Sequence, residues 1–314
     1  MINLSRFIAP ILVFPFILGC HQSDHLKPTE GFLSVKGGKI WYKIVGEGNK
    51  TPILTLHGGP GGPGFYLKPL ASLANDRSVI FYDQLGCGRS DHIQDTSLMT
   101  VDHYKEELGE LIKFLGLKKF YLYGQSWGTM LGTEYYLSNP EGIEAIILSS
   151  PYLSTALWIK DADTLISQLP DSTQMDIRRS EKNKTYTDSP YLRAVDIYYK
   201  RYLARKLPWS ADTDSSFAQL GENVYNFMWG PSEFTCTGNL KNADLTKRLG
   251  EIKVPTLLIC GAFDEARLST VKYFQTLIPG SKVSVIENAG HLTMQDNPAA
   301  DEEAIRNFLD NIEK

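Results

Sequence analysis

The fold of this 314-residue chain is decided by one stretch, Phe120-Tyr121-Leu122-Tyr123-Gly124-Gln125-Ser126-Trp127-Gly128. Its first four residues are aromatic or apolar, which predicts a short buried strand. Residues 129–137 have a helix-like pattern that Asn139-Pro140 ends. A Gly-x-Ser-x-Gly turn between a strand and a helix holds the serine on a sharp corner, with its hydroxyl exposed above the sheet. Ser126 is therefore the predicted nucleophile, and the glycines are expected where strand and helix pass too close for a Cβ.

Short hydrophobic strands alternate with helices on both sides of this turn. A hairpin is predicted over residues 31–46, around the turn Gly37-Gly38. Further strands are predicted at residues 52–56, 78–82, 143–148, 254–260 and 282–286, and helices at 101–115, 268–277 and 298–312. This alternation predicts an α/β fold with a mainly parallel sheet covered by helices on both faces. Ligands of such sheets bind at the carboxyl ends of the strands, where Ser126 lies.

The strand–helix alternation is interrupted between residues 152 and 242. This region is rich in aromatic residues, contains no clear strand and is predicted to be mostly helical. We therefore expect a core built from residues 31–151 and 243–314, with residues 152–242 inserted as a helical cap, or lid, over the site.

Two residues beyond the insertion complete a candidate catalytic triad. A serine hydroxyl needs a base to take its proton, and the base needs an acid to orient it. In this type of fold the chain order is serine, acid, histidine. Asp264 follows the strand at 254–260, and His291 follows the strand at 282–286. The predicted triad is Ser126, Asp264 and His291.

Elimination also favours His291 as the base. The chain has six histidines, of which His57 belongs to a glycine-rich motif. The other four lie in the N-terminal segment or in polar sequence that looks mobile: His21, His25, His92 and His103.

A glycine-rich run, His57-Gly58-Gly59-Pro60-Gly61-Gly62-Pro63-Gly64, directly follows the strand at 52–56. Such a density of glycine lets backbone N–H groups approach a substrate oxygen closely. A phosphate-binding loop would need a Lys-Ser/Thr ending, which this run lacks. We predict that the N–H groups of Gly59 and Trp127 form the oxyanion hole.

Composition and cysteine usage exclude several other classes of protein. The formal net charge is −4 and no run of Lys or Arg is present, so no nucleic-acid partner is expected. The cysteines have no metal-type spacing, and neither a metal nor a cofactor is predicted. Cys260 ends an apolar run and is expected to be a core residue. A Cys87–Cys236 disulfide is left open.

The first twenty residues differ from the rest of the chain. Arg6 is the single charge before an apolar run at residues 7–18, which suits an export signal but is too short to span a bilayer. The sequence Ile17-Leu18-Gly19-Cys20 resembles a bacterial lipoprotein box. This resemblance implies a signal peptide at 1–19, a lipidated Cys20, a tether at 20–30 and a location on the bacterial cell envelope. An ordinary cleaved signal and an uncleaved anchor are the alternatives.

Four motifs together resemble the proline iminopeptidase family of α/β-hydrolases: His57-Gly-Gly-Pro-Gly61, Asp83-Gln-Leu-Gly-Cys-Gly-Arg-Ser90, Gly124-Gln-Ser-Trp-Gly128 and Gly261-Ala-Phe-Asp264. Within that family the chain is most similar to tricorn-interacting aminopeptidases and amino acid amidases. The resemblance runs from about residue 31 to the C-terminus and implies the α/β-hydrolase fold. Gln125 departs from it, because the family often has a glycine there. The segment at 83–90 is expected to shape the loop beneath the site rather than to react.

The cap carries a further match to this family. The segment Met228-Trp-Gly-Pro-Ser-Glu233-Phe resembles the one whose glutamate binds the substrate's α-amino group. Glu265 matches a second amine-binding glutamate, and Tyr225 matches a tyrosine beside them. Two carboxylates near the serine would suit this task, because each charge-assisted hydrogen bond contributes about 1.5–3 kcal/mol. From the residues alone, Glu233 is better explained as a solvated lid residue and Glu265 as an acid at a helix start.

The combined prediction is a serine aminopeptidase that releases an N-terminal residue, proline among the candidates, from short peptides or amino acid amides. A carboxylesterase or lipase on the same fold is the alternative, and it would not need Glu233 and Glu265. A non-catalytic surface lipoprotein is a third hypothesis, against which an intact triad counts. Haloalkane and epoxide chemistry are disfavoured, because those enzymes have an aspartate where Ser126 stands.

Overall fold

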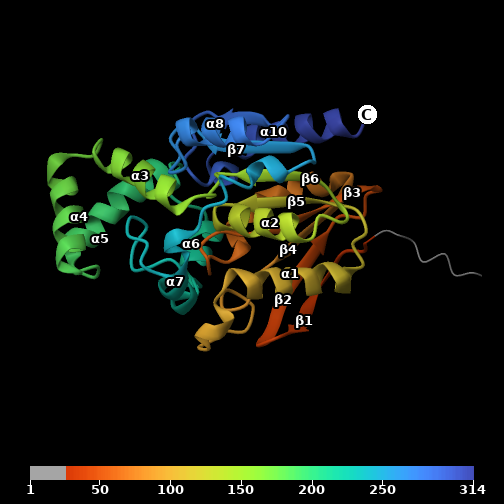
Figure 1. The fold of residues 1–314 in the computed structure, drawn as a ribbon, viewed down its shortest axis with the longest axis horizontal. Coiled ribbons are helices and arrows are strands. Elements are labelled where there is room, and N and C mark those ends of the chain that lie inside the picture. The colour runs from red at the N-terminus through yellow and green to blue at the C-terminus, as the bar shows by residue number, and fades with distance from the viewer. Residues whose placement is uncertain (1–25) are drawn as a thin grey trace, which may run out of the picture.

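A computed structural model describes residues 26–314, and within them eight strands form one sheet (Figure 1). In spatial order they are β1 (Thr29–Val35), β2 (Gly38–Val45), β4 (Arg77–Tyr82), β3 (Lys50–Leu56), β5 (Phe120–Gln125), β6 (Ile143–Ser149), β7 (Thr256–Gly261) and β8 (Lys282–Ile286). β1 pairs with β2 and β2 with β4 in antiparallel fashion, and all other neighbours are parallel. The predicted mainly parallel α/β fold is confirmed.

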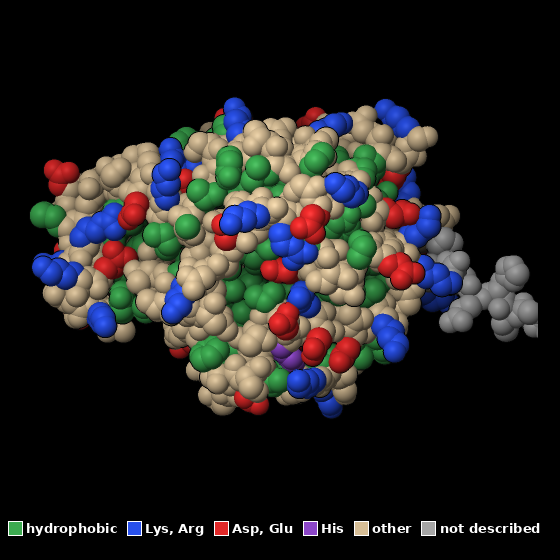
Figure 2. All heavy atoms as spheres, viewed as in Figure 1, with side chains coloured by type: hydrophobic (Ala, Val, Ile, Leu, Met, Phe, Trp, Pro, Cys, Tyr) green, Lys and Arg blue, Asp and Glu red, His purple; other side chains and the backbone are tan. Residues whose placement is uncertain are grey.

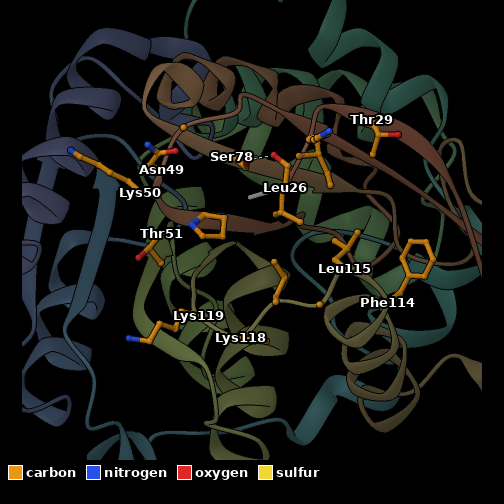
Figure 3. Close-up of a pocket in the computed structure, with 16 residues that line it drawn as sticks. Leu26, Thr29, Asn49, Lys50, Thr51, Ser78, Phe114, Leu115, Lys118 and Lys119 are labelled. Atoms are coloured by element: carbon orange, nitrogen blue, oxygen red, sulfur yellow. Dashed lines mark hydrogen bonds between the residues drawn. The ribbon is translucent and has the colours of Figure 1, made fainter. Parts of the chain in front are cut away.

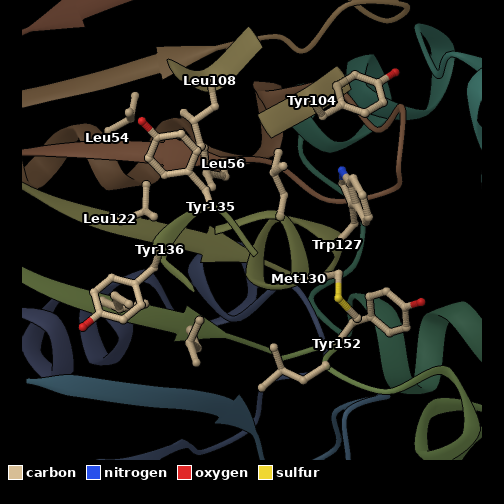
Figure 4. Close-up of a cluster of buried hydrophobic side chains, with 14 of the residues drawn as sticks. Leu54, Leu56, Tyr104, Leu108, Leu122, Trp127, Met130, Tyr135, Tyr136 and Tyr152 are labelled. Atoms are coloured by element: carbon tan, nitrogen blue, oxygen red, sulfur yellow. The ribbon is translucent and has the colours of Figure 1, made fainter. Parts of the chain in front are cut away.

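Helices cover both faces of the sheet, as the strand pattern requires. On one face lie α1 (Val101–Leu115), α2 (Trp127–Ser138) and α8 (Leu268–Leu277), and on the other the 3₁₀ segment η1 (Gly64–Asn75), α9 (Thr293–Asp296) and α10 (Pro298–Ile312). Successive strand residues point to opposite faces. In β5, Leu122 therefore packs under α1 and α2, while Tyr121 and Tyr123 pack on the η1 and α10 side. Figure 4 shows the first of these two layers around Leu122, Met130 and Tyr135.

Between β6 and β7 the chain leaves the sheet and forms helices with a small core of their own. They are α3 (Thr155–Ile166), α4 (Asp171–Asn183), α5 (Ser189–Tyr198), the π-helical turn η3 (Tyr199–Leu203), α6 (Ala211–Ala218) and α7 (Glu222–Met228). In Figure 1, α3, α4 and α5 project to the left of the sheet. Their apolar side chains, including Leu165, Ile177 and Tyr198, form a cluster separate from those of the two sheet faces. The insertion is mostly helical, as predicted.

The structure differs from the sequence-based expectation in the tether, at His103 and in two helical segments. Thr29 and Glu30, assigned above to the tether, already belong to β1, because they pair with Ile44 and Lys43 of β2. The Glu30 carboxylate also accepts from Trp41 Nε1 at 3.0 Å and pairs with Lys43 Nζ at 2.8 Å. His103 is not in mobile sequence but is buried in α1, edge-on to Tyr104. The segments η1 and α9 are absent from the predicted elements.

The surface drawn in Figure 2 carries Lys and Arg side chains interspersed with Asp and Glu, without a large field of one sign. Among residues 26–314, no helix combines the length and the apolar character needed to cross a membrane. The predicted signal peptide at 1–19 and the predicted lipidation residue Cys20 lie outside the described residues.

Candidate active site

Ser126 occupies the corner between β5 and α2. Its backbone angles are φ 52° and ψ −121°, a left-handed conformation that L-residues rarely adopt. A Cβ on Gly124 would collide with Gly128 O, and a Cβ on Gly128 would collide with Leu56 O. The two glycines are therefore required by close strand–helix packing, as the sequence predicts, and this packing supports the strained serine.

Asp264 and His291 meet at the carboxyl ends of β7 and β8. The register pairs Gly261 with Ile286, so the loops that follow the two strands start side by side. His291 Nδ1 lies 2.8 Å from Asp264 Oδ1, and both side chains are buried. An acidic partner at Nδ1 assigns the ring proton to that nitrogen and leaves Nε2 as the free basic atom.

The Asp264 carboxylate is held by three further donors. Oδ1 accepts from Ala266 N at 2.8 Å, and Oδ2 accepts from Gly261 N at 3.0 Å and lies 2.7 Å from Ser150 Oγ. Each of the two Asp264 oxygens therefore has two hydrogen-bond partners, His291 included, and this fixes the orientation of the carboxylate toward His291.

Ser150 is a residue that the sequence analysis missed. It directly follows β6, has φ 49°, and its hydroxyl lies within hydrogen-bond distance of both Asp264 Oδ2 and His291 O, the latter at 2.8 Å. The neighbouring Ser149 O accepts from Ser126 N at 3.0 Å. The position of Ser150, one residue beyond a strand end beside β5, is the sequence signal that could have identified it.

The glycine-rich loop lies against the serine corner. A Cβ on Gly58 would stand 3.1 Å from Ser126 Cβ, and Gly58 N–H donates to the Tyr66 hydroxyl at 2.7 Å. Because the Gly58 amide is occupied, Gly59, with φ 107°, is the next N–H along the loop. Trp127 is the first residue of α2, so its N–H belongs to the open end of that helix. The geometry is compatible with the predicted roles of Gly59 and Trp127 as oxyanion donors.

The segment at residues 83–90 supports this loop, as predicted. Asp83 is fully buried; its carboxylate accepts from Gly64 N at 3.0 Å and forms a two-pronged pair with Arg89 at 2.7 and 2.9 Å. The Arg89 guanidinium stacks on the Trp41 ring, 3.3 Å from its centroid. These contacts connect the glycine-rich loop to the sheet.

His57 has a structural role in the same loop. Its Nε2 accepts from Gln84 N at 2.9 Å, so the proton lies on Nδ1, which donates to Gly58 O at 3.0 Å. Burial lowers the pKa of the His57 imidazole. A neutral ring with both nitrogens occupied is not available as a general base.

A pair of carboxylates lies beside the triad. Glu265 comes from the core and is buried, and neither of its side-chain oxygens has a hydrogen-bond partner among residues 26–314. Its Oε2 is 4.0 Å from His291 Nδ1. Glu233 comes from the cap, is half-buried, and accepts from the Tyr225 hydroxyl at 2.7 Å. The structure therefore brings together all three residues matched to amine binding.

The raised pKa values of Glu265 and Glu233 indicate a site that would be stabilised by a positive charge. Burial, followed by the nearby charges of Glu233 and Asp264, raises the pKa of Glu265 well above its ordinary value. Burial also raises the pKa of Glu233. An unpaired buried carboxylate is strongly unfavourable, and a cation bound between the two would restore the ionised form. We therefore expect the pair to select a positively charged group.

The cysteines of the described residues form no disulfide, and no metal site is found among those residues. Cys87, Cys236 and Cys260 are free thiols, so the disulfide left open between Cys87 and Cys236 is not formed. Cys260 is a buried core residue, as predicted. No cluster of three His, Cys, Asp or Glu side chains within residues 26–314 is arranged to hold a metal.

A cavity of about 1080 Å³ lies away from this site (Figure 3). Its lining includes Lys50 and Thr51, which begin β3, and Leu115 and Lys119, which precede β5. These residues mark the amino ends of the strands, whereas Ser126, Asp264 and His291 follow the carboxyl ends. The cavity is therefore not part of the catalytic centre.

Comparison with known proteins agrees with the fold. The family model described as "alpha/beta hydrolase fold" matches residues 51–298. The proline iminopeptidase of Heyndrickxia coagulans is 41% identical over 288 residues, covering 90% of this chain and 99% of that protein. The crystal structure of the proline iminopeptidase of Mycobacterium smegmatis superposes with a TM-score of 0.84 at 31% identity, covering 90% and 98% of the two chains. The crystal structure of VinJ gives a TM-score of 0.87 at 31% identity, covering 91% and 100%. The chain thus belongs to the proline iminopeptidase family of α/β-hydrolases.

Proposed function

We propose that this protein is a serine aminopeptidase that releases one N-terminal residue from short peptides or amino acid amides. The observation that carries the proposal is Glu265, a buried carboxylate near Glu233 that has no hydrogen-bond partner within residues 26–314. Its Oε2 lies 4.0 Å from His291 Nδ1. A substrate ammonium held by the two glutamates would stand at a fixed distance from its own first carbonyl. This fixed distance would place the carbonyl of the first residue, and no later one, at Ser126.

The chemistry follows from the residues around Ser126. His291 Nε2 takes the Ser126 proton as the hydroxyl oxygen attacks the carbonyl carbon, and Asp264 stabilises the imidazolium that results. The N–H groups of Gly59 and Trp127 receive the negative oxygen of the tetrahedral intermediate. His291 then protonates the leaving amine, which departs with the rest of the peptide. A water molecule, deprotonated by the same histidine, hydrolyses the acyl-enzyme and releases the N-terminal residue.

Proline is the N-terminal residue we propose first, because relatives at 34–41% identity are named proline iminopeptidases. No cofactor takes part in the proposed reaction. Tyr198 and Tyr199 of the cap lie near the carboxylate pair, and Tyr199, which is partly exposed, is suited to contact an apolar N-terminal residue. The nearby charges of Glu233 and Glu265 contribute to the raised pKa of both tyrosines, after burial.

The choice of substrate tests this proposal against an esterase on the same scaffold. We expect prolyl-p-nitroanilide to be cleaved with a kcat/KM about 10²–10⁴ times that of its N-acetylated form, because acetylation removes the cation and two charge-assisted hydrogen bonds. Steady-state kinetics on free and acetylated aminoacyl-anilides, with p-nitrophenyl butyrate as a third substrate, provide the measurement. An esterase would cleave the butyrate ester far better than either anilide and would not distinguish the free from the acetylated amine.

We also propose that the enzyme is held on the bacterial cell envelope by lipid on Cys20. Support comes from the apolar run at residues 7–18 and the box Ile17-Leu18-Gly19-Cys20. Several acyl chains on one cysteine would anchor the catalytic domain stably, whereas one chain alone would not. With β1 starting at Thr29, the tether would span residues 20–28.

Metabolic labelling tests the anchor. The chain expressed in a bacterium with an alkynyl fatty acid should take up label and sediment with membranes, and Cys20→Ser should lose both properties. Cys236→Ser, which removes a half-exposed thiol of the cap, is the control and should keep them. A wild-type chain without label, or label that persists in Cys20→Ser, would disprove lipidation at Cys20.

A further inference from the structure

Three hydrogen bonds join the three catalytic segments of this site through two side chains, Gln125 and Tyr66. Gly58 N–H donates to the Tyr66 hydroxyl at 2.7 Å, the Tyr66 hydroxyl donates to Gln125 Oε1 at 2.6 Å, and Gln125 Nε2 donates to His291 O at 3.2 Å. Both connecting side chains are buried. The series therefore runs from the oxyanion loop, past the serine corner, to the backbone of the general base.

The direction of this series is fixed by the donor at its start. A backbone N–H can only donate, so the Tyr66 oxygen accepts from Gly58 and its single proton goes to Gln125. This sets the Gln125 amide with its oxygen toward Tyr66 and its NH₂ toward His291 O. Rotating the amide by 180° would place two oxygens, Gln125 Oε1 and His291 O, against each other. Burial raises the pKa of the Tyr66 hydroxyl, so it keeps the proton that it donates.

Tyr66 is itself anchored at its backbone. Its N–H donates to Ser216 Oγ at 3.1 Å, and its carbonyl accepts from Gln295 Nε2 at 2.6 Å. Ser216 lies in α6 of the cap, and Gln295 lies in α9, shortly after His291. The hydroxyl of Tyr66 thus has a defined position relative to both the cap and the base.

Gln125 packs closely against the glycine-rich loop and thereby determines the position of that loop. A Cβ on Gly58 would stand 2.7 Å from Gln125 Oε1 and 3.0 Å from the Tyr66 hydroxyl. Gly58 is therefore in direct contact with both side chains, and Gly59 is the next residue. A displacement of Gln125 would move the Gly59 N–H relative to the oxygen of the tetrahedral intermediate, and losses of 10²–10³ in turnover follow when such a donor is removed.

We infer that Gln125 and Tyr66 are positioning residues that keep the oxyanion loop and His291 in register with Ser126. The inference rests on the proposed serine mechanism and deepens it. Gln125 occupies the position at which the chain departs from the glycine frequent in its family. A glycine there could make neither of the two hydrogen bonds, so this connection between oxyanion loop and base depends on the glutamine.

Two substitutions test the inference at different points of the series. Gln125→Met keeps the length of the side chain and removes both hydrogen bonds, and Tyr66→Phe removes the hydroxyl alone. We expect each to lower kcat by about tenfold to a hundredfold on both prolyl-p-nitroanilide and p-nitrophenyl butyrate, with KM for the anilide within about twofold. Inhibition by an alkyl boronic acid, which forms a tetrahedral adduct on the serine, should weaken in parallel with kcat/KM.

Tyr82→Phe is the matched control for these variants. Tyr82 is a buried tyrosine of β4 whose hydroxyl has no hydrogen-bond partner within residues 26–314, so its removal should leave kcat unchanged. Unchanged kcat in Tyr66→Phe, an equal loss in Tyr82→Phe, or a change in KM alone would overturn the inference. If Gln125→Met fails to fold by circular dichroism, Tyr66→Phe decides. Loss on the ester identifies defective positioning, whereas failure of amine recognition would leave ester turnover intact.

Discussion

Ser126→Ala is expected to lower kcat on prolyl-p-nitroanilide by about 10⁶-fold, to near the background rate, because no other group in the site can form the acyl-enzyme. The substitution removes only the hydroxyl oxygen, and Gly124, Gly128 and the contact from Ser126 N to Ser149 O are unaffected. The protein should therefore fold normally. Turnover measured at high enzyme concentration, together with labelling by a fluorophosphonate, checks the prediction.

The matched control for this variant is Ser138→Ala, at the other end of the same helix α2. Its hydroxyl donates to Glu134 O on the surface, so the variant should keep wild-type turnover and fluorophosphonate labelling. Anilide hydrolysis that persists in Ser126→Ala at more than a hundredth of the wild-type rate would exclude Ser126 as the nucleophile.

Asp264→Asn should lower kcat by about 10⁴-fold on both anilide and ester substrates. Asp264 Oδ1 accepts from His291 Nδ1 and Ala266 N, and Oδ2 faces Gly261 N. An asparagine must place its NH₂ at one of these two positions, where it opposes at least one backbone donor. If the NH₂ faces His291, the ring is forced into the other tautomer and loses Nε2 as a base.

A second buried carboxylate separates this catalytic effect from simple destabilisation. Asp301 is another buried acid, which accepts from the Thr293 hydroxyl at 2.7 Å and lies in α10. Asp301→Asn should change the free energy of unfolding but keep kcat within about threefold. A loss of less than tenfold in kcat for Asp264→Asn would show that Asp264 does not orient the base.

Much of the fold follows from local sequence pattern. The strands of the parallel sheet are short runs buried on both faces, so continuous hydrophobicity predicts them without knowledge of their partners. The helix predicted at residues 101–115 coincides with α1, because Thr100 caps its first turn and Gly116 ends it in a left-handed conformation. Local pattern does not predict a strand boundary that tertiary pairing decides, as at Thr29, which joins β1 through its antiparallel partner Ile44.

The parts of the site that sequence did not predict are those made by contacts between distant residues. Ser150 approaches Asp264 across 114 positions of the chain, and Gln125 approaches His291 across 166. No local pattern encodes such contacts, whereas the strained serine and the glycine-rich loop are local and visible. Glu233 and Glu265 required both sources of information: the family resemblance identified them, and the structure places the cap carboxylate close enough to the core carboxylate for their charges to interact.

The most direct test of the central claim, that the carboxylate pair of Glu233 and Glu265 selects a free N-terminal amine, is the effect of Glu265→Gln on amine selectivity. Glu222→Gln, which neutralises an exposed acid of the cap, is the control and should leave selectivity unchanged. We predict that Glu265→Gln lowers the ratio of kcat/KM for free over N-acetylated prolyl-p-nitroanilide by about 10–150-fold, while kcat/KM for p-nitrophenyl butyrate stays within about threefold. Equal losses on the anilide and the ester, with an unchanged ratio between free and acetylated substrate, would contradict amine recognition by Glu265.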